Sequence, residues 1–200
     1  MFSACEKLTS ADPIKDWNTE SVEKMNYMFV NCSSLKSADL KAWDLPNINA
    51  MESMFNGTPV KNPFEDVFPM ACPREGSFEG WCRGSAEITV ERRRENVTVE
   101  KRRESINVLV KLNIPEKAKR SSTFGKRCRA NMAVPIGIYD MEGNELLGVT
   151  KARTDMGYAG YISFEIGKTV LMNDFNTDRF EPNGKGIRFY MDFDDAAKAD

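Results

Sequence analysis

Large apolar residues recur at a fixed spacing in the first third of the chain. The pattern begins at Trp17 and continues with Val22, Met25, Met28 and Phe29. It recurs 26 positions later at Trp43, Ile48, Met51, Met54 and Phe55. Within each copy the aliphatic and Met-Phe positions follow helix-like spacing, which predicts one helix over residues 22–29 and another over 48–55. The stretch SLKSADL, residues 34–40, predicts a short strand after the first helix.

Each helix–strand copy is too small to bury its own apolar face, so the copies are expected to stack as a short solenoid. Stacking would place Trp17 against Trp43 and Cys5 near Cys32. A stripe of large apolar residues is far more typical of a core than of a ligand site. The expected core residues are Trp17, Val22, Met25, Met28, Phe29, Trp43, Ile48, Met51, Met54 and Phe55.

The hydrophobic pattern changes at Ser85 to a period of two. Segments such as AEITVE, INVLVKLNI and GYISFEIG alternate or run apolar, and turn signals such as DMEGN and EPNGKG separate them. Seven or eight short strands over about 110 residues are typical of an antiparallel β-sandwich. The predicted fold class is therefore α+β, a short leucine-rich-repeat-like solenoid followed by an antiparallel β-sandwich. The expected domains are the repeats in 1–60, a Pro/Cys cap and linker in 61–84, and the sandwich in 85–200.

The motif W-[DN]-x-x-x-[VI]-x-x-M-x-x-M-F-x-x-C-x-x-L resembles the repeat of BspA-like surface proteins, which are relatives of the leucine-rich repeats. The resemblance covers residues 1 to about 60. It implies adhesion or binding without catalysis, mostly at bacterial cell surfaces, although some such proteins belong to protists, algae or phages. The later stretch VPIGIYDMEGNELLGVTKARTDMGYAGYISFEIG resembles Ig-like or prealbumin-like β-sandwich modules of bacterial surfaces.

Positive charge is concentrated in one segment of a chain whose net charge is −2. Residues 91–129 hold 13 Lys and Arg against 5 Asp and Glu. Residues 91–104 interleave acidic and basic side chains with valines, which favours a solvated strand face. Residues 117–129 lack these acids, so a partner site and a solvated loop both stay open there. The candidate partner-binding residues are Lys117, Lys119, Arg120, Lys126, Arg127 and Arg129.

The expected partner of these cations is an acidic protein, a sulfated glycan or an anionic lipid. Nucleic acid is the least favoured polyanion, because no aromatic residues are interleaved with the cations for base stacking.

Two cysteines, Cys72 and Cys82, lie ten positions apart in a stretch rich in proline and glycine. Outside the cell they would close a disulfide, and inside it they would be reduced thiols near Trp81; the sequence leaves both open. The chain has no histidine, which removes the commonest general base and the commonest zinc ligand. We therefore expect no metal, no cofactor and no enzymatic activity.

These features together predict a non-enzymatic cell-surface module that binds a protein or glycan through the repeat surface and the sandwich loops. The alternative is a structural subunit of a phage virion or of an algal or bacterial complex, with the solenoid as its docking surface. The expected location is extracellular or at the cell surface, with a virion or other large assembly as the alternative. No membrane span is expected, because no run approaches the ~18 apolar residues that a span requires.

Overall fold

The structure is a computed structural model, which describes the whole chain except residues 49, 66, 69, 94–98, 123–125, 157–159, 181–183 and 200. The chain divides into two compact units. The repeat unit comprises Met1–Met70, Ser122–Gly125 and Asn176–Gly184, and the β unit comprises Ala71–Ser121, Lys126–Phe175 and Lys185–Asp200.

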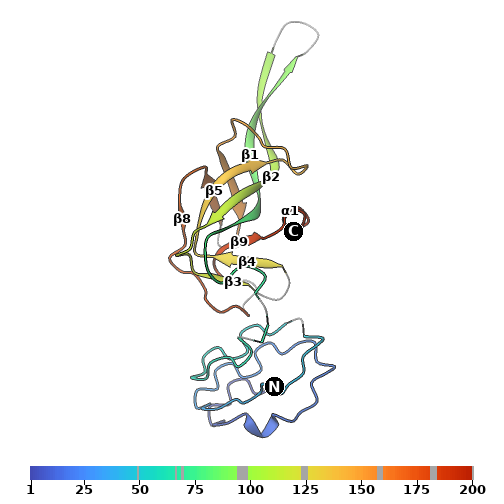
Figure 1. The fold of residues 1–200 in the computed structure, drawn as a ribbon, viewed down its shortest axis with the longest axis vertical. Coiled ribbons are helices and arrows are strands. Elements are labelled where there is room, and N and C mark those ends of the chain that lie inside the picture. The colour runs from blue at the N-terminus through green and yellow to red at the C-terminus, as the bar shows by residue number, and fades with distance from the viewer. Residues whose placement is uncertain are drawn as a thin grey trace. The chain divides into compact units, whose positions relative to one another are not determined.

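Regular secondary structure lies almost entirely in the β unit and consists mainly of strands (Figure 1). The strands are β1 (Phe78–Arg93), β2 (Val99–Ile114), β3 (Arg120–Ser122), β4 (Arg127–Ala130), β5 (Met132–Tyr139), β6 (Lys151–Asp155), β7 (Tyr161–Glu165), β8 (Val170–Leu171) and β9 (Ile187–Tyr190). A short helix, α1 (Phe193–Ala197), follows β9. In the described part of the repeat unit, the one helical element is the 3-10 helix η1 (Asp12–Ile14).

The strands form one antiparallel sheet in the order β3-β4-β9-β1-β2-β5-β8, while β6 pairs with β1 and β7 pairs with β6. The expected fold class, α+β with a solenoid followed by a β-sandwich, is therefore wrong. Regular structure in the described residues is nearly all strand, and the strands belong to one sheet instead of two facing sheets.

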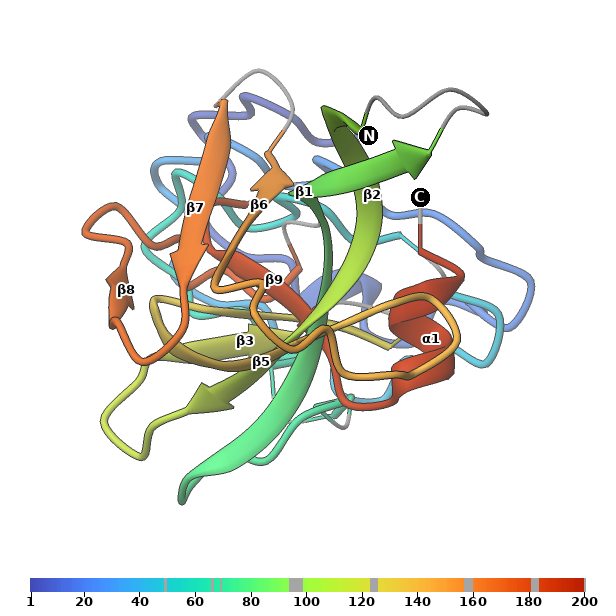
Figure 2. The ribbon, with the colours of Figure 1, turned by 90° about the horizontal axis from the view of Figure 1, so that it is seen from above.

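The sandwich prediction failed because alternation shows which residues share a face of a strand but not which strands pair. The middle of β2 illustrates the difficulty, since the consecutive residues Val108, Leu109 and Val110 are all fully buried. Both faces of β2 are thus covered within a single sheet. The paired strands β1 and β2 twist strongly across the unit (Figure 2), as long two-stranded ribbons do.

A cluster of half-buried aromatic rings in the β unit surrounds Trp81 on β1. Its ring meets Tyr139 and Phe193 edge-on, each with ring centroids 5.1 Å apart. The Lys111 ammonium lies 5.7 Å from the centre of the same ring. Because Phe193 belongs to α1 and Tyr139 to β5, this one side chain joins two elements to the long hairpin of β1 and β2.

Backbone hydrogen bonds in the repeat unit run between copies instead of within helices. The N–H groups of alternate residues in the copy that contains Trp17 donate to carbonyls of the copy that contains Trp43. These bonds run from Met25 to Ala50, Tyr27 to Glu52, Phe29 to Met54 and Asn31 to Asn56, all at 2.8–2.9 Å. An earlier copy begins at Met1 and Phe2, 27 positions before Met28 and Phe29. It donates to the Trp17 copy in the same way, from Phe2 to Met28 and from Ala4 to Val30.

The described residues of 22–29 and 48–55 do not form the predicted helices, and turns occupy 26–29 and 52–55. Tyr27 and Ser53, which are 26 positions apart, have left-handed φ values of 57° and 49°. A left-handed residue with a side chain is incompatible with a right-handed helix. Ala4 and Asn31, 27 positions apart, are likewise left-handed at 56° and 58°. The helix-like spacing of apolar residues therefore reflects successive turns that direct their side chains to one side.

Aromatic rings from successive copies stack in two columns. Phe29 stacks between Phe2 and Phe55 at centroid distances of 5.5 and 5.2 Å, and Trp43 stacks between Trp17 and Phe64 at 6.5 and 6.1 Å. The Trp43 indole N–H also donates to the Ile14 carbonyl at 3.0 Å. The large side chains therefore contribute to a core shared between copies.

Most of the residues expected in the repeat core are buried, namely Met25, Met28, Phe29, Trp43, Met51, Met54 and Phe55. Val22 and Ile48 are partly buried against them. Trp17 is 44% exposed, although its ring stacks on Trp43 and lies 6.2 Å from the Phe2 ring in a tilted contact.

A segment from late in the chain, Asn176–Gly184, completes the repeat unit. Arg179 donates from one terminal nitrogen to the carbonyls of Glu65 and Phe68 at 2.6 and 2.8 Å. Phe180 is 3% exposed and meets the Phe68 ring edge-on at 6.2 Å. The described part of this segment thus satisfies carbonyls that follow the last repeat and adds a ring to the core.

Candidate functional site

The hairpin of β6 and β7 has one apolar and one polar face. The two strands pair antiparallel with Lys151 opposite Glu165, Arg153 opposite Ser163 and Asp155 opposite Tyr161. These residues share a face because side chains alternate along a strand. The intervening apolar residues, Ala152, Ile162 and Phe164, are buried. Alternation thus directs a row of polar groups and one tyrosine outward.

The hairpin joins the main sheet at a single close crossing between β1 and β6. Ser85 is opposite Arg153, whose Nε donates to the Ser85 hydroxyl at 3.4 Å. The Thr154 hydroxyl donates to the Arg83 carbonyl at 2.8 Å. A Cβ atom on Gly84 would lie 2.5 Å from the Arg153 carbonyl oxygen, so the strands approach this closely because residue 84 is glycine.

An open groove of about 700 Å³ lies along this crossing. We call it the polar groove; it is lined by Ser85, Ala86 and Glu87 of β1, Ser105 of β2, Lys151, Ala152 and Arg153 of β6, Tyr161, Ser163, Phe164 and Glu165 of β7, and Lys168, Thr169 and Val170. Two neighbouring hollows of about 410 and 280 Å³ share Ser85 and Arg153 with it. The hairpin that forms one wall is visible in Figure 2 as β6 and β7 lying side by side.

The charges of the polar groove are partly paired. One Glu165 oxygen lies 2.8 Å from the Lys168 ammonium, and the other lies 3.7 Å from the Lys151 ammonium. The hydrogen bond from Lys168, with the nearby charge of Lys151, holds the pKa of Glu165 below its usual value. Glu165 is thus a fixed negative charge near neutral pH. Glu87 is exposed and opposes the hydroxyl-bearing Ser105 across the β1–β2 pair.

Arg153 and Tyr161 are two exposed recognition groups in the groove. The Tyr161 side chain is 66% exposed, although it is a large aromatic residue. The Arg153 guanidinium lies 5.9 Å from the centre of the Tyr161 ring, within cation–π range. This contact presents a planar cation and an aromatic ring together beside the hydroxyl groups of Ser85 and Ser163.

Two residues of the predicted basic site are engaged inside the β unit. Arg129 is 1% exposed and donates to the Ser121 hydroxyl at 3.4 Å. Arg120 is half-buried, packs over the Phe78 ring at 5.1 Å and donates to backbone carbonyls of Ala118, Pro73, Gly76, Pro115 and Glu116. These guanidinium groups hold the chain together and are poorly placed to meet a partner.

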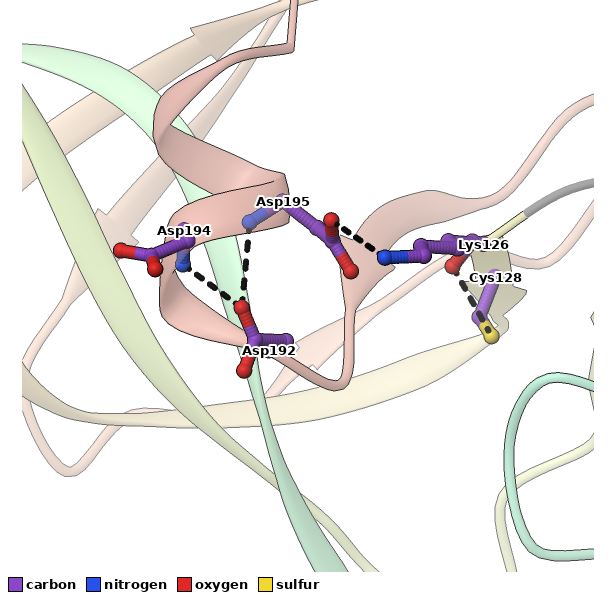
Figure 3. Close-up of polar contacts among 5 residues, drawn as sticks. All are labelled: Lys126, Cys128, Asp192, Asp194 and Asp195. Carbon is purple, nitrogen blue, oxygen red and sulfur yellow. Dashed lines mark hydrogen bonds and ion pairs between the residues drawn. The ribbon is translucent and has the colours of Figure 1, made fainter.

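The other predicted cations are nearer the surface. Lys126 binds Asp195 at 2.8 Å, and the Asp192 carboxylate caps α1 by accepting from the N–H groups of Asp194 and Asp195 (Figure 3). The pKa of Lys126 is raised by this hydrogen bond and ion pair. Arg127 is half-buried at the start of β4, whereas Lys117 and Lys119 are exposed before β3. The structure therefore does not gather all six cations on one surface.

The cysteines of the predicted disulfide have different neighbours. Cys72 forms a side-chain hydrogen bond with Cys128, and this contact, together with burial, raises the pKa of Cys128. Burial raises the pKa of Cys82 on β1 to about 12, a shift opposed in part by Thr154 and Arg188. All five cysteines are thiols in the structure. The Cys72–Cys82 disulfide stays a prediction, and the structure identifies Cys128 as the thiol beside Cys72.

Sequence reasoning did not single out any residue of the polar groove. The alternation in KARTD and YISFE, with the turn signal DMGYAG between them, contained enough information to place Arg153 and Tyr161 on the outer face of one hairpin. The contribution of Ser85 and Glu87 had no such signal, because they lie far from the hairpin in sequence.

The fold and groove define a β-rich module with an open polar groove, joined in one chain to a stacked repeat. Residues 68–196 match the profile of a family of unknown function, DUF5758, and the chain belongs to this family. Residues 1–66 match a second family, described as Mycoplasma protein of unknown function, DUF285. This second match is compatible with the BspA-like repeat, and neither match supports the Ig-like resemblance.

No curated protein and no solved structure matches the chain. Within the described ranges, no helix has the length and apolar character needed to cross a membrane. The same residues contain no group of three or more acidic or cysteine side chains arranged to hold a metal ion.

Proposed function

We propose that the chain is a non-enzymatic binding module that holds a protein or glycan ligand in the polar groove of the β unit. The observation that carries this proposal is the combination of Arg153, Tyr161 and three serines along one open groove of about 700 Å³. Sites with a few convergent polar groups around an exposed aromatic ring suit reversible recognition. The repeat unit, whose large residues are committed to its core, serves in this proposal as a spacer or second contact surface.

The electrostatics of the groove favour binding over catalysis. General acid–base chemistry needs a group whose pKa lies near the working pH. The pKa of Glu165 is shifted away from neutrality by Lys168 and Lys151, so this carboxylate is poorly suited to donate a proton. It is well suited to orient the two lysines as hydrogen-bond donors.

We also propose that the protein acts outside the cell or at a cell surface. The support is the resemblance of the repeat to BspA-like surface proteins, with which the match of residues 1–66 is compatible. A virion or another large assembly remains the alternative location.

The experiment is to screen arrays of glycans and extended peptides with the full chain and with a groove-blocking variant, Ser163→Trp. The variant fills the centre of the groove from an exposed position, so the β unit should stay folded. The proposal predicts that the screen finds at least one ligand class and that the variant loses its binding. Binding that is equal in both proteins, or consumption of the probe during incubation, would overturn it.

A second candidate function, a structural subunit of a larger assembly, is favoured by the β1–β2 hairpin. Beyond Ala86 and Ile106 the two strands pair with each other and with no other described strand (Figure 1). An isolated two-stranded ribbon is marginally stable in water, so a partner that covers it would stabilise it. Light scattering of the full chain, and of a variant with residues 89–103 replaced by a short turn, tests this candidate. A defined assembly that is lost in the shortened variant would support it, whereas a monomer in both proteins would contradict it.

A further inference from the structure

Resting on the proposed binding function, we infer that the ligand of the polar groove is an oligosaccharide that carries carboxylate groups, such as a chain of uronic acids. Four features of the groove carry this inference: an accessible guanidinium, an exposed ring, flanking hydroxyls and a limited excess of positive charge.

The guanidinium of Arg153 is the natural partner of a carboxylate. Its Nε contacts the Ser85 hydroxyl, and no ion pair joins it to an acidic side chain of the described residues. The two terminal nitrogens of a guanidinium match the two oxygens of a carboxylate in a planar fork. Since Arg153 lines the main groove and both neighbouring hollows, a carboxylate bound there would lie at the centre of the site.

The Tyr161 ring supplies the apolar contact that a sugar requires. A sugar ring presents C–H groups on its faces and hydroxyl groups on its rim. The C–H face packs on an aromatic ring, and the rim bonds to the surrounding polar groups. Tyr161 is 66% exposed, and the hydroxyls of Ser105 and Ser163 and the carboxylate of Glu87 line the same groove. These groups include both donors and acceptors, as sugar hydroxyls need.

The balance of charge selects a ligand with a moderate density of negative charge. Lys151, Arg153 and Lys168 line the groove, but so do Glu87 and Glu165. A densely sulfated glycan, with several sulfates on each disaccharide, would place several negative groups near these two carboxylates, and like charges at such distances repel. A uronic acid chain carries one carboxylate per sugar, and one of these carboxylates can pair with Arg153.

The floor of the groove argues against an extended peptide as the ligand. Peptide recognition usually relies on an apolar or aromatic anchor inserted into a pocket. Here the apolar lining includes the small buried residues Ala86 and Ala152, while Phe164 is 1% exposed. The large apolar side chain Phe164 is thus already buried by its own packing, and the exposed groups along the groove are mostly hydrogen-bonding ones.

The test is calorimetric titration of the full chain with tetragalacturonic acid and with its methyl ester, which differs by the loss of the carboxylate charges. We expect the acid to bind and the ester to bind at least about tenfold more weakly, because hydrogen bonds to charged groups are the stronger ones. Arg153→Gln is expected to weaken acid binding by a similar factor and to remove the difference between acid and ester.

Two further variants separate recognition from folding. Lys198→Gln changes the net charge equally at an exposed position outside the groove, and it should leave binding unchanged. Tyr161→Ala should weaken the acid and the ester alike, because the ring meets the sugar face and not the carboxylate. Far-UV circular dichroism confirms that each variant is folded.

Four outcomes would overturn the inference. Equal binding of acid and ester, with loss in Tyr161→Ala, would establish a groove for neutral glycans and leave the proposed function standing. Tighter binding of a heparin-derived tetrasaccharide would establish sulfate recognition and also leave it standing. If no glycan binds but a peptide does, and Ser163→Trp abolishes the peptide binding, the inference is wrong but the proposed binding function stands. If neither a glycan nor a peptide binds, the inference and the proposed function are both wrong.

Discussion

The two units of this chain satisfy their backbone hydrogen bonds in different ways. In the repeat unit, an N–H group such as that of Phe29 donates to a residue about one repeat away, and the aromatic rings of successive copies stack above one another. In the β unit, neighbouring strands pair directly, and the polar faces of β1, β6 and β7 remain open. The comparison teaches that one unit uses its large side chains for packing between copies, whereas the other leaves a polar surface available for a ligand.

The largest expected effect comes from truncating a ring in the repeat column. Phe29→Ala removes a fully buried side chain that contacts rings in both neighbouring copies. We expect a loss of about 3–5 kcal/mol from the free energy of unfolding, confined to the repeat unit. Hydrogen exchange measured by mass spectrometry checks this, with Phe164→Ala as the matched variant in the β unit. An equal increase of exchange in both units after Phe29→Ala would show that the two units do not unfold separately.

The next effect concerns the crossing on which the groove depends. Gly84→Ala would place a Cβ atom 2.5 Å from the Arg153 carbonyl oxygen and push β6 away from β1. We expect the free energy of unfolding to fall by about 3 kcal/mol. This is at the upper end of the cost of overpacking, because the clash is with the backbone. Chemical denaturation measures this loss. Ser85→Ala, which removes only a hydroxyl at the same crossing, should cost much less, and similar losses in the two variants would contradict this account.

A smaller effect is expected where Asn176–Gly184 completes the repeat unit. Arg179→Lys cannot maintain the guanidinium geometry that serves the Glu65 and Phe68 carbonyls. We expect the free energy of unfolding of the repeat unit to fall by about 2 kcal/mol, which is measured as a lower melting temperature of that unit. The comparison variant is Arg120→Lys, which should destabilise the β unit and leave the repeat unit unchanged.

The smallest effect is a pH dependence of the β unit. Burial raises the pKa of Cys82 to about 12 from an ordinary value of 9.0, so the folded state keeps this thiol protonated after the unfolded state has lost its proton. Stability is therefore fully present below pH 9 and decreases as the pH rises toward 12, by about 1 kcal/mol at pH 10.

Urea denaturation of the β unit at a series of pH values checks this slope. Cys82→Ala should reduce it, although Cys128, whose pKa is also raised, leaves a remainder. Cys5→Ala, at an exposed cysteine, should leave the slope unchanged. A slope that is identical in the wild type and in Cys82→Ala would show that this thiol does not carry the effect.

The sequence was most informative where neighbouring positions decide the structure. Alternation identified strand residues such as those of INVLVKLNI, and the repeat alignment paired Trp17 with Trp43, whose rings stack. The helices were wrong because the apolar spacing does not reveal the left-handed backbone of Tyr27 and Ser53. Side chains such as these rarely adopt that conformation, so their identity gave no warning.

Contacts between residues far apart in the sequence could not be predicted, for a different reason. Nothing in the pattern predicts that Arg153 lies against Ser85, or that Arg179 serves the carbonyls of Glu65 and Phe68. Such contacts depend on which strands pair and where the chain returns, and a single sequence does not encode these as a local period. The polar groove is made of these contacts, so it became visible only in the structure.

The most direct test of the central claim is amide chemical-shift mapping of the full chain during titration with tetragalacturonic acid. The account predicts that shifts cluster at Ser85, Arg153, Ser163 and Lys168, and that they disappear in Arg153→Gln. Shifts that cluster instead in the repeat unit, with the groove unchanged, would contradict the claim that the β unit carries the binding site.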